Sequence, residues 1–121
     1  MANTFKVVTF AAEPASAGTA YKMYTVAGST TTVVLGLILT NIGTTAVTAE
    51  VELVSDTGSR GGANNVSNGT SFLAKDVSIP AGTSLELLSG GKVVLVATDE
   101  LKIDCSVADK LSGTLSIMEI T

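Results

Sequence analysis

Apolar and polar residues alternate with a period of two along most of the chain, a spacing typical of β-strands with one exposed face. Between Val47 and Val54, valine, alanine and leucine alternate with threonine and glutamate, and the stretch from Leu101 to Val107 repeats the pattern. Residues 32–40 and 93–97 are apolar on both faces, as in strands that are covered on both sides. No long window carries a helical stripe free of glycine and proline. The pattern therefore predicts an all-β fold.

Turn-forming residues separate these runs. Asn41 and Gly43 favour left-handed backbone in one turn, Pro80 breaks the chain at another, and residues 89–92 favour a tight hairpin. Short antiparallel strands separated by turns predict a β-sandwich, either a jelly roll or an immunoglobulin-like sandwich, with no substantial helix. We expect a single domain over residues 1–121, in which residues 1–20 comprise a strand and an extended N-terminal arm. The expected strands, about nine in number, are residues 4–10, 21–26, 31–40, 46–54, 71–79, 84–89, 92–97, 101–107 and 113–120.

Composition narrows the range of functions. The 121 residues carry 7 basic and 11 acidic side chains. The net charge of −4 disfavours nucleic acid and anionic membranes as partners, because both attract positive charge. Histidine and tryptophan are absent and there is one cysteine, so most metal sites and nucleophile–base pairs lack their residues. We therefore expect no metal, no cofactor and no enzymatic activity.

Residues 1–8 do not resemble a secretory signal, because they lack a basic segment followed by a continuous apolar one. The longest apolar run, residues 33–39, is far shorter than the ~20 residues that cross a membrane. Cys105 lies on the apolar side of its predicted strand, where we expect it to be buried. We expect a chain that is made in a cytoplasm and contains no intrachain disulfide.

Two pairs of carboxylates are candidates for acid–base chemistry, Glu50 with Glu52 and Asp99 with Glu100. Strand alternation explains Glu50 and Glu52 as residues of an exposed face, and no flanking segment predicts a cleft around either pair. We therefore expect neither pair to be catalytic.

A long polar loop is predicted over residues 55–70. It contains Asp56 and three asparagines, which are possible calcium ligands, but a single formal charge and irregular spacing favour a solvated loop. Asn65 and Asn68 each begin a glycosylation acceptor pattern, and we interpret both as ordinary loop residues. The sequence leaves open whether this loop contacts a partner or solvent.

The apolar positions exceed what two facing sheets can cover. Several predicted strands direct apolar residues to both faces; Val34 and Ile38, for example, are expected to face away from Leu37 and Leu39. Because large exposed apolar patches are rare on isolated proteins, we expect other copies of the chain or a larger assembly to cover part of this surface. The candidate interface residues are Phe5, Phe10, Tyr21, Tyr24, Val34, Ile38, Val94, Val96, Met118 and Ile120.

The sequence also resembles a known family. The stretch from Leu37 to Leu53 is similar to the strand–turn–strand of small tailed-bacteriophage virion proteins. A second run resembles phage head-decoration, neck and tail-fibre proteins. It consists of Ile79-Pro80-Ala81-Gly82-Thr83-Ser84-Leu85, then Asp99-x-Leu101-Lys102, then Leu115-Ser116-Ile117-x-Glu119. The resemblance covers residues 30–120 and includes no catalytic motif.

This resemblance implies a non-enzymatic, multimeric β-sandwich of a virion, assembled in the cytoplasm of a bacterial host. A capsid cement or decoration protein fits best, stabilising the shell through apolar sheet surfaces and the N-terminal arm, and a neck, tail or fibre component is the alternative. The partners would be the major capsid protein or other virion proteins, together with further copies of the chain, for example in a trimer. A carbohydrate-binding or adhesive sandwich is a second alternative, which the absence of a tryptophan platform disfavours.

Overall fold

The computed structural model describes residues 2–55, 69–88 and 91–121. These residues form nine strands and no helix, which confirms the predicted all-β sandwich. The calcium candidates and glycosylation patterns of the polar loop, and the tip of the hairpin predicted at residues 89–92, lie outside the described residues. The strands are β1 (Asn3–Glu13), β2 (Tyr21–Thr25), β3 (Thr31–Asn41), β4 (Val47–Ser55), β5 (Gly69–Ile79), β6 (Ser84–Leu87), β7 (Val93–Leu95), β8 (Glu100–Cys105) and β9 (Leu111–Ile120).

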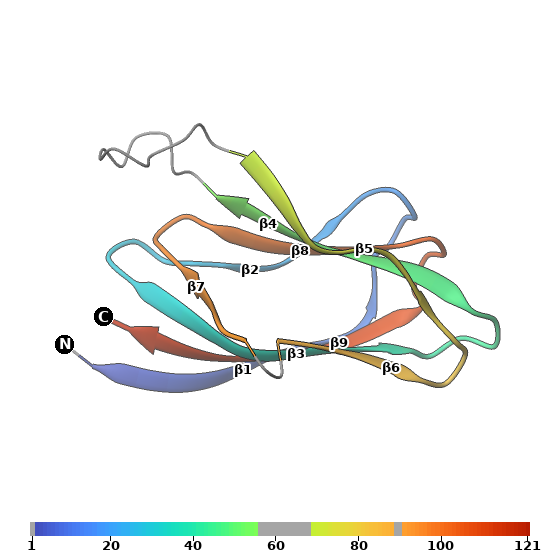
Figure 1. Ribbon diagram of the computed structural model, residues 1–121, viewed down its shortest axis with the longest axis horizontal. Helices are drawn as coiled ribbons and strands as arrows, with labels where there is room; N and C mark the ends of the chain where they lie inside the picture. Colours follow the sequence, from blue (N-terminus) through green and yellow to red (C-terminus); the bar gives the residue numbers. More distant parts are fainter. Residues whose placement is uncertain (1, 56–68, 89–90) are drawn as a thin grey trace.

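The strands form two antiparallel sheets that pack face to face, as Figure 1 shows. Sheet A has the order β1-β9-β3-β6, with β7 also paired to β3, and sheet B has the order β2-β8-β4-β5. The pairs are nested along the chain: β1 with β9, β2 with β8, β3 with β6 and β7, and β4 with β5. A long antiparallel hairpin folded over on itself produces this nesting, in which β6 and β7 share the place of one strand. The connectivity is that of a jelly roll, which decides between the two sandwich types predicted.

The core lies between the two sheets and receives alternate residues from the central strands of each. Complete burial of a valine, leucine or isoleucine side chain contributes about 1.5–3 kcal/mol to the free energy of folding. Cys105 is a buried free thiol, as its place on the apolar side of the strand predicts. The largest fully buried side chains are Leu37, Leu39, Ile79, Leu95, Leu101, Ile103, Leu111, Leu115, Ile117, Val26, Val34 and Val51.

A buried asparagine joins two turns at one end of the sandwich. The Nδ2 of Asn41 donates hydrogen bonds to the carbonyl oxygens of Thr45 and Ile79, each at 2.9 Å. Its Oδ1 accepts a hydrogen bond from the backbone nitrogen of Gly43 at 2.8 Å. Neither Asn41 nor Gly43 has a positive φ, so the left-handed backbone predicted for this turn is wrong. The turn is closed by the side chain of Asn41 instead, and both polar atoms of the buried amide have hydrogen-bond partners.

The first strand continues into part of the segment expected as an arm. Residues 11–13 belong to β1, and residues 14–20 connect β1 to β2. Pro14, at the start of this connection, is buried, and its carbonyl oxygen accepts a hydrogen bond from the backbone nitrogen of Asp109 at 2.8 Å. The connection is therefore fastened to the turn between β8 and β9.

The pairing of β3 with β9 contains a β-bulge. Val34 lies opposite Ile117 and Gly36 lies opposite Ser116, so Leu35 is an extra residue in β3 with no partner of its own. Such a bulge changes which residues share a face on either side of it.

The bulge overturns one prediction about the outer surface. Val34 shares the inner face with Leu37 and Leu39 and is 0% exposed, so its predicted outward position is wrong. Val33 occupies the outer face instead, together with Ile38, which was expected there. The prediction assumed strict alternation along β3. The extra residue breaks this alternation, so residues before the bulge and residues after it do not follow one odd–even pattern.

Valine-to-threonine exchange distinguishes the two faces of β3, because the side chains have similar shapes and threonine adds a hydroxyl. Val34→Thr places this hydroxyl in the apolar core, and we expect the free energy of unfolding to fall by about 1–3 kcal/mol. Val33→Thr places it on the half-exposed outer face, and we expect a change within about 0.5 kcal/mol. Denaturant unfolding measures both values. A larger loss for Val33→Thr than for Val34→Thr would contradict the bulge.

Candidate functional site

A row of four apolar side chains crosses the outer face of sheet A. Phe5 of β1 lies opposite Met118 of β9, which in turn lies opposite Val33 of β3. Val33 lies opposite Val94 of β7. Residues directly opposite each other on antiparallel strands share a face, so the four side chains form a continuous line, which we call the apolar row. Phe5 and Val94, at its two ends, are 72% and 58% exposed.

Further apolar residues flank the apolar row. Val7 follows Phe5 on the same face of β1 and is 63% exposed, and Ile38 lies beyond the bulge and is 41% exposed. Leu35 and Ile120 are half-buried. The other strand positions on this face are mostly serine and threonine, and Glu86, opposite Ile38, brings a negative charge.

The bulge hollows the same face beside the apolar row. A cavity of about 310 Å³ opens there. It exists because Gly36 has no side chain and Ser116, opposite it, has a short one. A hollow within apolar surface suits a protruding side chain of a partner protein. Its lining includes Leu35, Gly36, Leu37, Ile38, Glu86, Thr114 and Ser116.

The outer face of sheet B is charged. The Nζ of Lys22 lies 3.0 Å from Glu100 Oε2, and the Nζ of Lys102 lies 3.8 Å from Glu100 Oε1. On the neighbouring strands, Lys75 Nζ lies 2.7 Å from Glu50 Oε1. Exposed pairs of this kind add little stability, but they keep the surface hydrated. The sandwich therefore has one charged outer face and one apolar outer face.

Other predicted interface residues lie elsewhere. Phe10, Tyr21 and Tyr24 are half-buried and pack against the core. The rings of Phe10 and Tyr21 meet edge to face, with centroids 5.2 Å apart, and Phe10 also covers Gly113, its partner on β9. Val96 is half-buried beyond the end of β7. The predicted residues that the structure gathers on the outer face of sheet A are Phe5, Ile38, Val94, Met118 and Ile120.

Tyr24 joins the two sheets. Its hydroxyl donates a 2.5 Å hydrogen bond to Oε2 of Glu119 and lies 2.8 Å from Oγ1 of Thr32. Burial raises the pKa of Tyr24 to about 12, and the hydrogen bond to Glu119 adds to this effect. Lys6 Nζ lies 2.7 Å from Glu119 Oε1; its hydrogen bond lowers the pKa of Glu119, with help from the hydrogen bond of Tyr24. Residues from β2 of sheet B and from three strands of sheet A are thus connected.

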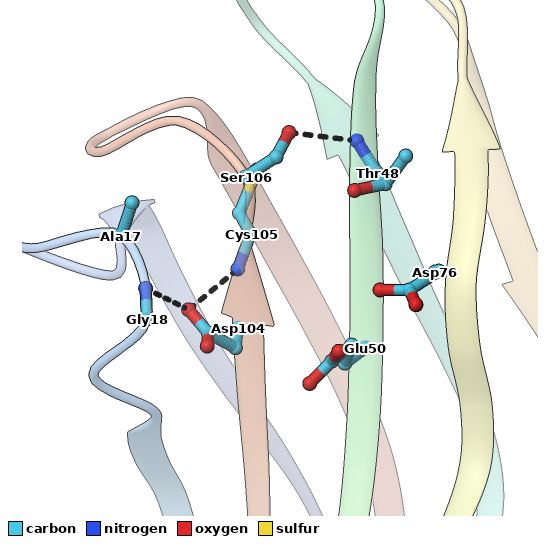
Figure 2. A pocket seen from close by; sticks show the side chains of 8 residues that line it. All are labelled: Ala17, Gly18, Thr48, Glu50, Asp76, Asp104, Cys105 and Ser106. Carbon is cyan, nitrogen blue, oxygen red and sulfur yellow. Dashed lines mark hydrogen bonds between the residues drawn. The ribbon is translucent and has the colours of Figure 1, made fainter.

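A pocket of about 360 Å³ opens on the outer face of sheet B, next to the β1–β2 connection (Figure 2). Glu50, Asp76 and Asp104 line it. The Oδ1 of Asp104 accepts hydrogen bonds from the backbone nitrogens of Gly18 at 3.2 Å and Cys105 at 2.8 Å, and Glu50 is held by its lysine partner. Sequence reasoning missed Asp76 and Asp104, because it could not supply the register that places Glu50 opposite Asp104.

The candidate carboxylates serve local structure. Asp99 is buried, and its two carboxylate oxygens accept hydrogen bonds from Ser55 Oγ and from the backbone nitrogen of Val96, each at 3.0 Å. In the part of the chain that the structure describes, no group of three or more His, Cys, Asp or Glu side chains is placed to hold a metal ion. The same residues include no helix with the length and hydropathy needed to span a bilayer.

No family model and no curated protein matches the sequence. Among solved structures, the chain is similar to a chain of the infectious bursal disease virus Gx strain, with a TM-score of 0.53 and 14% identity over 96% of this chain and 32% of that one. It is also similar to a chain of the T13 viral particle of this virus, with a TM-score of 0.55 and 11% identity over 97% and 30% of the two chains. A third similar structure, from the disulfide-linked pili of Bacillus endospore appendages, has a TM-score of 0.48 and 16% identity, over 99% and 87%.

The chain spans about a third of the length of the two viral chains. At such low identity the likeness concerns the fold, and a fold by itself does not assign a function. The comparisons therefore establish a sandwich of the kind that these viral chains contain.

The cluster of Lys6, Tyr24 and Glu119 should make the free energy of unfolding decrease at acidic pH. Because the pKa of Glu119 is lowered in the folded chain, its stabilising contribution is complete above the ordinary carboxyl pKa and is lost as the pH falls through the folded value. We expect the wild-type chain to lose more unfolding free energy than Glu119→Gln between about pH 5 and about pH 3. Denaturant titrations at several pH values measure the two losses. Equal losses would contradict the assigned ion pair.

Proposed function

We propose that this chain is a non-enzymatic structural component of a virus particle, which binds neighbouring proteins through the outer face of sheet A. The apolar row from Phe5 to Val94 is the observation that carries the proposal. Soluble proteins seldom leave a patch of this kind open to water. Assembly through sheet A would bury the patch while the ion pairs of sheet B stay hydrated.

The jelly-roll connectivity supports the same proposal. The two similar structures with TM-scores above 0.5 come from a virus and from its T13 particle. Jelly rolls also occur in lectins and cupins, so the fold supports a virion role only in combination with the surface. A sandwich with one face apolar and the other charged is suited to lying flat against a neighbour.

Within this class we place the chain among tailed-bacteriophage proteins, as a capsid cement or decoration protein. The support is the sequence resemblance over residues 30–120. The resembling run at residues 79–85 forms the turn from β5 into β6, and the closing run forms β9, which contributes Met118 to the apolar row. A neck, tail or fibre component would use the same surface and would lie on the axis of the particle instead of over its shell.

The size of the face suits a contact that is repeated many times. Sheet A has four strand positions; at ~4.8 Å spacing and ~10 residues of length they cover roughly 600 Å². A standard interface buries ~800 Å² per partner, and association costs offset much of the gain from apolar burial. Each contact is therefore modest in strength, and a symmetric shell multiplies it over many copies.

Introducing a charge into the apolar row tests the proposal. Val94→Asp places a carboxylate at an exposed end of the apolar row, so we expect a folded protein that binds to particles more weakly. Val107→Asp is the matched control, because Val107 is also exposed and lies in the turn between β8 and β9, away from sheet A's outer face. Cosedimentation with particles of the source virus assembled without this chain measures binding. We expect an affinity loss of about tenfold or more for Val94→Asp.

The position of the bound protein separates the two virion roles. Cryo-electron microscopy of the reconstituted particles would show density over the whole shell for a cement or decoration protein and density on the portal–tail axis for the alternative. Equal binding of Val94→Asp and the wild-type chain would overturn the assignment of the surface.

A further inference from the structure

The edge strand β1 is long, regular and exposed. It pairs with β9 from Asn3 to Phe10 without a register shift, and the first shift lies between Phe10 and Glu13. Asn3 to Val7 are exposed on both faces of the strand, so this part of β1 projects beyond the cover of sheet B. Among the described strands, β9 is its one partner. The backbone groups on its outer side are therefore open to another strand.

The other sheet edges carry features that discourage pairing. The edge strand β2 has five residues and a register shift between Lys22 and Tyr24. The edge strand β5 has two register shifts against β4, and its Asp76 has a φ of 51°. At the opposite edge of sheet A, β6 and β7 are separate short strands. By comparison, β1 is unprotected.

Lys6 does not prevent another strand from pairing with β1. A lysine near a strand edge normally discourages pairing, because its charge would be buried by the incoming strand. Here the Nζ of Lys6 lies 2.7 Å from Glu119 Oε1, on the next strand inward. Its charge is therefore neutralised within the chain and directed away from the open edge.

From these features we propose that β1 pairs antiparallel with β1 of a second copy of this chain. An identical strand is the simplest complement, since a two-fold axis normal to the sheet brings the two β1 edges together in antiparallel order and leaves each outer face on the same side. Odd-numbered residues of one β1 then lie opposite odd-numbered residues of the other. Depending on the register, Phe5 and Val7 therefore lie beside Phe5, Val7 or Thr9 of the partner copy. Apolar residues meet apolar or neutral ones on the outer face.

Charge selects the register. Pairing centred on Lys6 would place two lysines directly opposite each other, which is unfavourable. Pairing centred on Val7 places Val7 opposite its own copy and Lys6 opposite Val8, and it aligns the strand from Asn3 to Ala11. The dimer contact is therefore centred on Val7.

The two copies then form one continuous sheet with a single outer face. In this register Phe5 lies opposite Thr9 of the partner copy, so the two apolar rows lie on the same outer face but are offset along the paired strands, and the surface that sheet A offers to a partner is doubled. Self-association of this kind does not depend on the virion role, because it concerns the purified chain alone.

The mass of the purified protein tests the proposal. Sedimentation equilibrium or light scattering at about 10–100 µM chain should give a mass approaching twice 12.2 kDa. Val7→Lys places like charges opposite each other at the two-fold axis, so we expect the dissociation constant to rise about tenfold or more. Ile42→Lys is the matched control, since Ile42 is also exposed and lies in the β3–β4 turn, and it should dimerise as the wild-type chain does.

Cross-linking tests the register even if Val7→Lys fails to fold. Opposite residues of antiparallel strands have Cα atoms ~4.5–5.5 Å apart, which a disulfide can span. In a Cys105→Ala background, Val7→Cys should form a disulfide-linked dimer on mild oxidation, and Ile42→Cys should form none. A monomeric mass for the wild-type chain, or equal cross-linking of the two cysteine variants, would overturn the proposal.

The virion role and the β1 contact can be tested independently of each other. A monomeric chain that still binds particles would remove the β1 contact and leave the virion role intact. A dimer that binds no particle would remove the virion role and leave the β1 contact intact.

Discussion

The pairing of β3 with β9, with its single bulge at Leu35, is the constraint on which both faces of sheet A depend. Because register holds on each side of the bulge, Val34 reaches the core together with Leu37, while Val33 joins the outer apolar row. An uninterrupted strand would also turn Thr32 outward. Thr32 would then lose its contact with the hydroxyl of Tyr24, through which sheet B is joined to sheet A.

The two outer faces of the sandwich differ in polarity. Ion pairs such as Lys75 with Glu50 keep sheet B compatible with water, whereas sheet A offers a nearly uncharged surface hollowed at Gly36. The ends of the described chain support this arrangement, because the backbones of Ala2 and Thr121 exchange hydrogen bonds of 3.2 and 2.9 Å. They hold the exposed end of β1 in register with β9, as Figure 1 shows for the adjacent termini. A flat assembly surface and a regular edge thus belong to the same sheet.

The candidate surface could be predicted only in part. Phe5, Ile38 and Val94 were accessible to sequence reasoning because a surplus of apolar residues on both faces of a strand is visible without a fold. Tyr24 was expected at the interface, but it packs against the core, since an aromatic residue in an N-terminal strand can equally fill a core or a surface. Its position follows from a partner, Glu119, at the far end of the chain. The pocket carboxylate Asp104 was missed for the same reason, because its neighbour Glu50 is brought to it by strand pairing.

The amino-acid sequence by itself determined the number and place of the strands, since alternation is a property of a few consecutive residues. It also determined that more apolar surface exists than two inner faces can hold. Only the tertiary structure decided between a jelly roll and an immunoglobulin-like sandwich, and which face of β3 points outward. The physical reason is that register and bulges are set by pairing between distant residues, such as Asn3 with Ile120, and local pattern carries no information about such partners.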